Sequence, residues 1–306
     1  MDRESFFLHV LQESSVIGKL NDDCALLQCS NKLLVAMDSF VEGTHFLLHT
    51  GFYPQWISYK SLARKAFIIT ISDIISSGAK PKFALLAITL PKYLTKLNIR
   101  EIVAGIEEVC SEYQIRLIGG DTIKGSNLCF HVTIMGELQG KYLSRDRVLC
   151  GDLLAYTSIR NGDLGSSLHA LRTLLRCKTK IPNTQRGVIE SANIYARFGN
   201  PLLRGNFLFK AQRYIHACMD ISDGLGMEIQ RLQKINGLGL SLRKSFKHSC
   251  PKHVYQSGEE YELLFSFFPK DLLALRYIAK LCRIKLHIVG QFERVKKQTL
   301  PIILWH

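Results

Sequence analysis

The first place in this sequence where residue types and spacing point to chemistry is Gly119-Gly120-Asp121. The apolar residues just before it, Ile115, Leu117 and Ile118, predict a short buried strand. Glycine lets the backbone turn sharply or approach a ligand closely, and the aspartate then presents a carboxylate at the end of the strand. The pattern indicates either a phosphate or metal site or an ordinary tight turn.

Three more aspartates of the first half stand beside apolar segments. Asp23 precedes one strand, and Asp38 follows the apolar run Leu33–Met37, which we expect to pair with that strand in a hairpin. Asp73 lies in the apolar middle of a predicted helix, where an uncompensated carboxylate costs several kcal/mol. A buried basic partner and a bound cation are both open for Asp73. A solvated turn at Asp23 and a strand-end cap at Asp38 are the plain alternatives.

In the second half, acidic residues again stand beside apolar strands. A strand ends on Asp220, and Ser222 or Asp223 is placed to cap the helix that follows. The segment Ser257–Glu262 sets three glutamates against a glycine before another apolar strand, as a solvated acidic turn would also do. Carboxylates that converge with few cations nearby are what a cluster of Mg²⁺ ions needs, because Mg²⁺ prefers hard oxygen ligands and bridges to phosphates.

The elements that position these side chains follow from the apolar spacing. We expect helices near residues 4–12, 56–77, 97–113, 166–176, 188–197 and 272–282. Strands are expected at 33–37, 83–90, 115–118, 128–135, 153–156, 218–220, 263–265 and 285–289. The turn at Gly151-Asp152 divides the chain into domains 1–148 and 149–306, both of the mixed α/β class.

Composition narrows the classes of function. The 306 residues are 47% hydrophobic and carry a formal charge of +14, which favours a negatively charged partner. The basic clusters near residues 243–248 and 294–297 match no nucleic-acid motif and are interpreted as a solvated face, so no nucleic acid is expected. Nine scattered cysteines, without a Cys-x-x-Cys pair, and the lack of a signal peptide or membrane-length apolar run predict a cytoplasmic protein without a membrane partner.

Familiar nucleotide motifs are missing. The segment 120–126 has the glycine spacing of a Walker loop but lacks the lysine that should follow, and no dinucleotide fingerprint, kinase catalytic loop or nucleophile elbow occurs. No Cys/His cluster suits zinc. A chain rich in carboxylates and punctuated by glycine is consistent with phosphoryl transfer organised by Mg²⁺.

An ordered set of motifs resembles thiamine-monophosphate kinase along nearly the whole chain. The motifs are Asp22–Leu27, Asp38 with Gly43–Phe46, Ile71–Asp73, Ile118–Thr122, Gly151-Asp152, Asp220–Leu225 and Gly258–Leu263. This resemblance implies a PurM-like, two-domain α/β protein that dimerises through its N-terminal sheets. It also implies the reaction of ATP with thiamine monophosphate to give ADP and thiamine diphosphate.

The resemblance assigns roles to residues at matching positions. It implies Mg²⁺ ligands at Asp23, Asp38, Asp73, Asp121, Asp220 and Asp223, and ATP contacts at Gly120, Asp121, Arg145 and Ser222. His45 and Glu259 match positions that meet the thiamine phosphate. The acceptor is an ionised phosphate oxygen, so no general base is assigned.

Four departures from the family pattern bear on these roles. Asn21 replaces a glycine, and Ala36-Met37 replace a hydroxyl pair, which removes one side-chain oxygen from a metal. Ser257 and Glu260 replace Gly and Asp but keep the charge, and the tail around Trp305 does not clearly match the family's ending. Two alternatives remain open: another ATP-dependent synthetase of the PurM superfamily, and a non-catalytic protein that binds nucleotide or nucleic acid.

Overall fold

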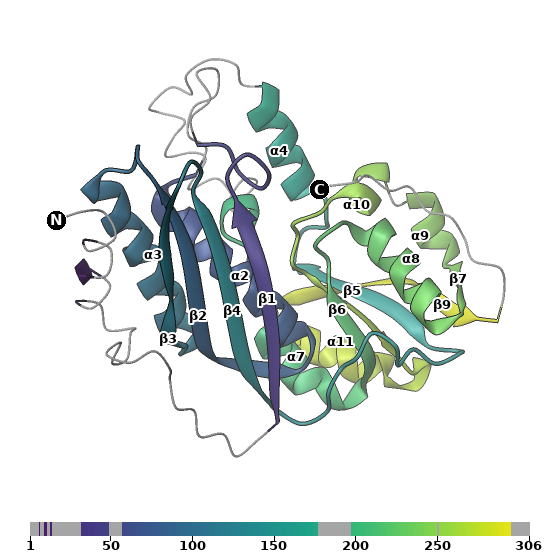
Figure 1. Ribbon diagram of the computed structural model, residues 1–306. Helices are drawn as coiled ribbons and strands as arrows, with labels where there is room; N and C mark the ends of the chain where they lie inside the picture. The colour runs from purple at the N-terminus through teal and green to yellow at the C-terminus, as the bar shows by residue number, and fades with distance from the viewer. Residues whose placement is uncertain are drawn as a thin grey trace.

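The computed structural model describes residues 32–48, 57–176, 197–249 and 251–294, together with positions 6, 9, 10 and 13. These residues form two β-sheets with helices packed against them, which confirms the predicted mixed α/β class (Figure 1). All strands of the first sheet precede Gly151, and all strands of the second follow it. The boundary placed between residues 148 and 149 remains a prediction.

The first sheet has four strands in the order β1-β4-β2-β3. The strands are β1 (Leu33–Val41), β2 (Ala79–Pro91), β3 (Arg116–Gly125) and β4 (Cys129–Leu138), and only β2 and β3 run parallel. Helices α2 (Tyr59–Ser76) and α3 (Lys96–Tyr113) lie together behind the sheet in Figure 1 and cover one of its faces. Burial alternates along β2 and β4, as expected for a sheet with one covered face.

Helix α2 is apolar nearly all round in its second half, Ile68–Ile75, and most side chains of the whole helix are buried. It begins at Ser58, whose hydroxyl accepts a hydrogen bond from the backbone N–H of Ser61 at 3.2 Å. It ends before Gly78, whose φ of +93° suits the left-handed turn after a helix. Both ends agree with the predicted helix, apart from Trp56, which lies outside the described residues.

The second sheet has five antiparallel strands in the order β6-β8-β5-β9-β7. Its strands are β5 (Leu153–Ile159), β6 (Ile215–Asp220), β7 (Gly239–Leu242), β8 (Leu263–Phe267) and β9 (Ile284–Glu293). One face packs on α8 (Leu225–Asn236), α9 (Lys244–Ser249) and α10 (Lys252–Gln256). The other face packs on α7 (Gly205–Ala211) and α11 (Leu272–Leu281), while α4 (Ser166–Arg176) leads away from β5. Two short 3₁₀ helices, η1 (Gln212–Tyr214) and η2 (Pro269–Asp271), precede β6 and α11.

Two expected strand ends were wrong. Asp38 lies inside β1, since the strand keeps pairing with β4 as far as Val41. Strand β3 does not end at Gly119-Gly120, because pairing with β2 continues to Gly125 after a register shift next to Leu117. Strand β1 pairs with β4, and the strand that was expected to form a hairpin with it lies outside the described residues.

Helix α2 joins the two halves of the molecule. It contacts three strands of the first sheet and also β6 and α7 from the second half. One hydrophobic core therefore runs from the first sheet through α2 to α7, α11 and the near face of the second sheet. None of the helices in the described part of the chain is long and apolar enough to cross a membrane.

Candidate active site

Three of the predicted aspartates are brought together at the junction between α2 and the two sheets. Asp38 comes from β1, Asp73 from near the C-terminal end of α2 and Asp220 from the end of β6. The Ser72 hydroxyl donates a hydrogen bond to Asp220 Oδ2 at 2.5 Å, which links residues 148 positions apart in the sequence. Helix α2 therefore carries the carboxylates of the first half to the one that ends β6.

The three carboxylates act on one another electrostatically. Burial raises the pKa of Asp73 to about 8, and the charges of Asp220 and Asp38 act in the same direction. Burial also raises the pKa of Asp220, although Ser72 and Arg145 oppose it. Burial raises the pKa of Asp38 in the same way, partly offset by nearby Thr70 and His45. The charged forms of all three are thus disfavoured where they stand and would be stabilised by a cation.

Cationic compensation from the protein is small. Arg145 Nη2 lies 3.8 Å from Asp73 Oδ1, and both side chains are partly exposed. A fourth acid, Glu228 of α8, is fully buried nearby, and burial raises its pKa to about 7 even though Arg231 pairs with it at 3.0 Å. The acids at this junction therefore outnumber the basic groups among the described residues. Two explanations were open for Asp73, a basic partner and a bound cation. Arg145 is a weak basic partner, so a bound cation is also compatible with the structure.

The donor set fits Mg²⁺. Asp38 Oδ2 is buried and accepts no hydrogen bond, and an orphan carboxylate oxygen of this kind is costly unless a cation or a donor reaches it. No three His, Cys, Asp or Glu side chains within the described ranges form a ready-made metal site. Asp23, the other acid expected from β1's neighbourhood, lies outside the described residues.

Ser222 and Asp223 lie directly after Asp220 but do not cap α8 as predicted. The residue at the helix start is Gly224, with φ of +100° and no side-chain cap. The backbone N–H of Asp223 donates instead to Glu228 Oε1 at 3.1 Å, and Arg231 Nη2 holds Asp223 Oδ2 at 2.5 Å. The acid in the first turn, Glu228, thus holds the backbone just before the helix start.

The segment 257–262 packs directly on this junction. The backbone N–H groups of Glu259 and Tyr261 donate to Ser222 O at 2.6 Å and Ile221 O at 2.9 Å. Both residues adopt left-handed backbone, with φ of +52° and +50°, which side-chain-bearing residues rarely do. The hydrogen bonds to the β6 end hold this strained turn in place beside Asp220.

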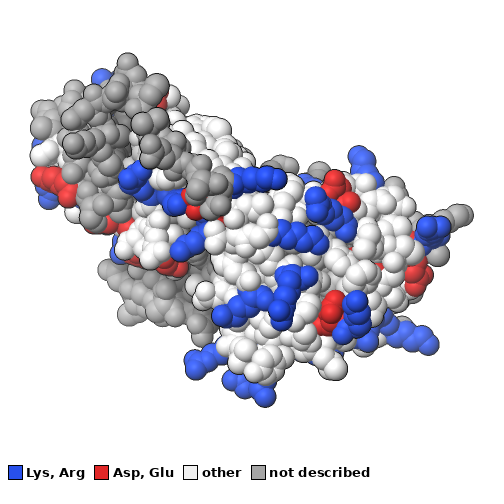
Figure 2. Space-filling model, turned by 90° about the horizontal axis from the view of Figure 1, so that it is seen from below, with Lys and Arg blue, Asp and Glu red and all other residues white. Residues whose placement is uncertain are grey.

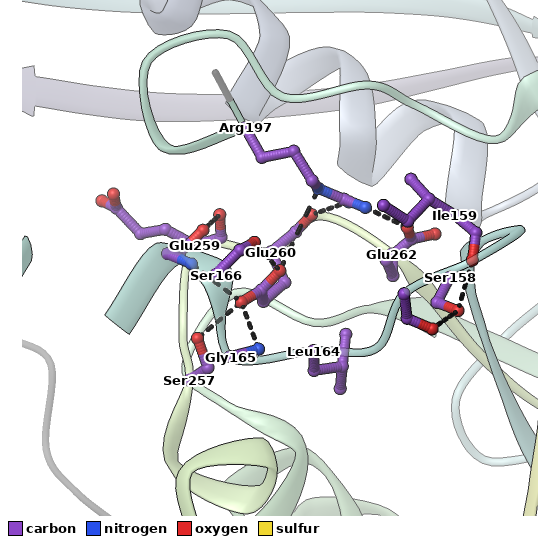
Figure 3. Close-up of polar contacts among 12 residues, drawn as sticks. Ser158, Ile159, Leu164, Gly165, Ser166, Arg197, Ser257, Glu259, Glu260 and Glu262 are labelled. Atoms are coloured by element: carbon purple, nitrogen blue, oxygen red, sulfur yellow. Dashed lines mark hydrogen bonds and ion pairs between the residues drawn. The ribbon is translucent and has the colours of Figure 1, made fainter. Parts of the chain in front are cut away.

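The alternative of a solvated acidic turn is excluded for this segment, because its three glutamates are buried. Glu260 accepts backbone hydrogen bonds from Gly165 and Ser167 at 2.8 and 3.1 Å, and Figure 3 shows Arg197 reaching between Glu260 and Glu262. Arg197 donates to the Glu260 carbonyl at 2.5 Å and also pairs with Glu262.

Basic partners compensate two of these buried acids. Arg204 pairs with Glu262 through two hydrogen bonds of 2.5 and 2.7 Å. Burial by itself would raise the pKa of Glu262, but Arg197 and Arg204 hold it below its ordinary value. Glu259 Oε2 lies 2.7 Å from Nζ of Lys65, which is fully buried on α2 and stacks 4.1 Å from the Phe198 ring centre. The predicted substrate contact Glu259 is therefore fixed from the other half of the chain.

Gly120 and Asp121 lie at the far edge of the first sheet from Asp38. Gly120 stands in the same row as Asp38, through Val132 and Leu86, about three strand spacings or roughly 14 Å away. A Cβ on Gly120 would come within 1.8 Å of the Leu86 carbonyl oxygen, so glycine is required here for strand packing alone. The structure does not place Asp121 with the other acids: it is exposed, and its carboxylate accepts the Thr122 N–H at 2.8 Å.

His45 lies in the turn after β1, where its Nδ1 accepts the backbone N–H of Val41 at 3.1 Å. Its ring is half-buried and packs 5.6 Å from that of Phe40. With Phe46, Ile57 and Phe198 it lines a small depression next to the buried Lys65. The position thus borders the Glu259 side of the site.

Several site residues escaped the sequence analysis. Lys65 and Glu228 stand among residues read only as helix, and Arg197 and Arg204 stand in a stretch without a motif. Ser72 lies inside the motif Ile71–Asp73, but no role was assigned to it. One signal was present: Lys65 interrupts an apolar helix two turns before Asp73, and a lysine on a buried face requires an acidic partner. Nothing in the sequence identified which acid that partner would be.

The fold and the carboxylate junction place this chain in the PurM-like class. Residues 21–138 match the family described as AIR synthase related protein, N-terminal domain. A crystal structure of thiamine-monophosphate kinase from Stenotrophomonas maltophilia K279a has a TM-score of 0.74 at 24% identity and shares the fold over 97% of this chain and 94% of that one.

The relatives in sequence narrow this class to one family. Thiamine-monophosphate kinase of Aquifex aeolicus is 30% identical over 274 residues, 85% of this chain and 82% of that protein. A structure of AaThiL complexed with AMPPCP and TMP has a TM-score of 0.68 at 26% identity, covering 97% of this chain and 90% of that one. The chain belongs to the thiamine-monophosphate kinase family.

Proposed function

We propose that this chain transfers the γ-phosphoryl group of ATP to thiamine monophosphate, forming thiamine diphosphate and ADP. The observation that carries the proposal is the convergence of Asp38, Asp73 and Asp220 at one junction, where the described residues supply Arg145 as a weak cationic partner of Asp73. Such a site needs cations and suits a reaction between two polyanions. The two substrates are inferred from the relatives named as thiamine-monophosphate kinases and from the relative whose structure is complexed with AMPPCP and TMP.

The proposed chemistry depends on position and charge. The acceptor phosphate oxygen is already ionised at neutral pH, so the site requires no general base. Asp38, Asp73 and Asp220 would hold Mg²⁺, with Asp23 and Asp223 as further predicted ligands. Asp121 stays a predicted ligand, but at the far edge of the first sheet it lies too far from Asp38 to share an ion with it. Bound Mg²⁺ would neutralise the crowded phosphates during in-line transfer. Ser72 fixes the Asp220 carboxylate, and Arg231 fixes that of Asp223, so both would meet a cation in one orientation.

Of the remaining predicted contacts, Arg145 and Ser222 lie near these carboxylates, whereas Gly120 lies at the far edge of the first sheet. Arg145 is exposed beside Asp73 and is proposed to bind ATP phosphates together with Gly120 and Ser222. His45 and Glu259 are proposed to contact thiamine monophosphate. Because Lys65 holds the Glu259 carboxylate, that side chain would meet the substrate from a fixed position.

The activity is tested with purified protein, ATP and Mg²⁺, with and without thiamine monophosphate. ADP release and chromatography of thiamine diphosphate are both measured. Product that requires both substrates and Mg²⁺ supports the proposal. Folded protein that makes no thiamine diphosphate overturns it and returns the superfamily synthetases and the binding protein to consideration.

We also propose that two copies of this chain form a homodimer through their first sheets. The chain is proposed to be cytoplasmic and to divide into two domains near residue 149. The face of that sheet opposite α2 and α3 carries exposed Val35, Met37 and Ile123, at 61%, 62% and 53% exposure. Apolar side chains gathered on an open sheet face favour burial against another surface. Met37→Asp should shift the mass measured by light scattering from dimer to monomer, and a monomeric parent protein would contradict the proposal.

A further inference from the structure

A second charged site lies on the C-terminal half, separate from the carboxylate junction. The end of β5, the last turns of α11 and the start of β9 surround a hollow of about 390 Å³. Its lining is Arg160, Arg276, Ala279, Lys280, Arg283, Ile284, Lys285 and Leu286. The volume falls within the range of small-molecule sites. Figure 2, seen from the side where α11 lies in Figure 1, shows far more Lys and Arg than Asp and Glu on that face.

The charges in this hollow are uncompensated. Its five basic side chains are all exposed, and none forms an ion pair with an acid of the described ranges. Among the residues that the structure describes, no acid lines the hollow, and its floor is formed by the apolar Ala279, Ile284 and Leu286. Five like charges gathered around one concavity repel one another, and an anion that entered it would relieve that repulsion.

Arg283 stands where glycine would cost less. It follows α11 and Cys282 with φ of +56°, in the left-handed position that usually ends a helix with glycine. Its backbone N–H donates to Lys280 O at 3.1 Å, which closes the turn. An arginine at this position has a less favourable backbone conformation than a glycine would, but it places a guanidinium in the lining of the hollow.

We propose that this hollow binds the diphosphate group of a small molecule. A single phosphate carries at most about two negative charges, so five cations are better matched by two linked phosphates. The three arginines come from the turn after β5, from α11 and from the turn after α11, and they offer forked N–H donors suited to phosphate oxygens. The apolar floor accepts an organic group attached to the diphosphate, and inorganic pyrophosphate satisfies the same cations without one.

The test is isothermal titration calorimetry of the full chain in EDTA. Without Mg²⁺ the carboxylate junction repels anions, so binding reports on the basic hollow and not on the proposed kinase site. The probes are inorganic pyrophosphate, ADP, orthophosphate and a single-stranded oligonucleotide. Arg283→Gly removes the guanidinium and relieves the left-handed backbone, and Arg276→Ala is a second variant. Lys92→Ala removes an exposed charge elsewhere and serves as the control.

Pyrophosphate should bind the parent and Lys92→Ala proteins equally, more tightly than orthophosphate, and about tenfold more weakly after either arginine change. Tighter binding of ADP than of pyrophosphate would identify an organic diphosphate as the ligand, and the reverse would identify the inorganic one. The proposal is overturned if both arginine variants bind pyrophosphate like the parent, if pyrophosphate does not bind, or if only the oligonucleotide does. Kinase turnover plays no part in this readout, so failure of one proposal is distinguishable from failure of the other.

Discussion

The buried pair between Lys65 and Glu259 provides the sharpest test of how the two halves are joined. Lys65→Met keeps the length of the side chain and leaves the Glu259 carboxylate buried without its partner. Breaking a buried pair in this way costs about 3–5 kcal/mol. The carboxylate can escape by taking a proton, which for an ordinary glutamate costs about 3.7 kcal/mol at pH 7 and about 1 kcal/mol at pH 5. The free energy of unfolding of Lys65→Met should therefore be lower than that of the parent protein by about 3.7 kcal/mol at pH 7, and this difference should shrink as the pH falls.

Equilibrium urea unfolding at pH 7 and pH 5, followed by circular dichroism, measures both values. Glu259→Gln added to Lys65→Met should recover much of the loss, because the unpaired charge is then gone. Lys60→Met is the matched control on the same helix: its pair with Glu108 is half exposed, so a change below about 1 kcal/mol is expected. A Lys65→Met protein as stable as the Lys60→Met protein at pH 7 would refute the reasoning.

The carboxylates of the site allow three more tests. Asp73→Asn should lower thiamine diphosphate formation by more than about a hundredfold with an unchanged circular dichroism spectrum, and a near-normal rate would remove Asp73 from the mechanism. In EDTA, the melting temperature should fall as the pH rises from about 4 towards 8, because folding raises the pKa of Asp73 and the folded state holds that proton more tightly. Asp73→Asn should make the melting temperature less dependent on pH. An equal dependence in both proteins would contradict the raised pKa of Asp73. Glu262→Gln should cost about 3–5 kcal/mol in urea unfolding, since Arg197 and Arg204 lose their buried partner, and a loss under about 1 kcal/mol would contradict that role.

The elements with strong apolar spacing were predictable from the sequence. Helices α2, α3, α4 and α11 and the strand that ends on Asp220 lie where the pattern placed them, because their burial depends on their own periodicity. Strand ends were less predictable. The extension of β3 beyond Gly120 depends on pairing with β2, which local sequence does not encode.

The candidate site was predicted in its acids but not in their partners. An aspartate within or just after an apolar segment is visible in the sequence, and Asp38, Asp73 and Asp220 do meet. The partners depend on contacts between distant segments: 194 residues separate Lys65 from Glu259, and the segment 257–262 is as polar as any surface turn. Its burial follows from its docking on the β6 end, which local sequence does not show.

Helix α2 explains why acids that are so far apart in sequence share one site. Lys65 and Ser72 are seven residues apart, two turns of helix, so both face the second half of the molecule. Lys65 fixes Glu259 at one end of that face, and Ser72 fixes Asp220 near the other, with Asp73 beside it. The helix is buried nearly all round, so it cannot rotate to relieve the repulsion among Asp38, Asp73 and Asp220. The core thus imposes a concentration of negative charge that these acids would not adopt on their own, and cation binding is the response this arrangement favours.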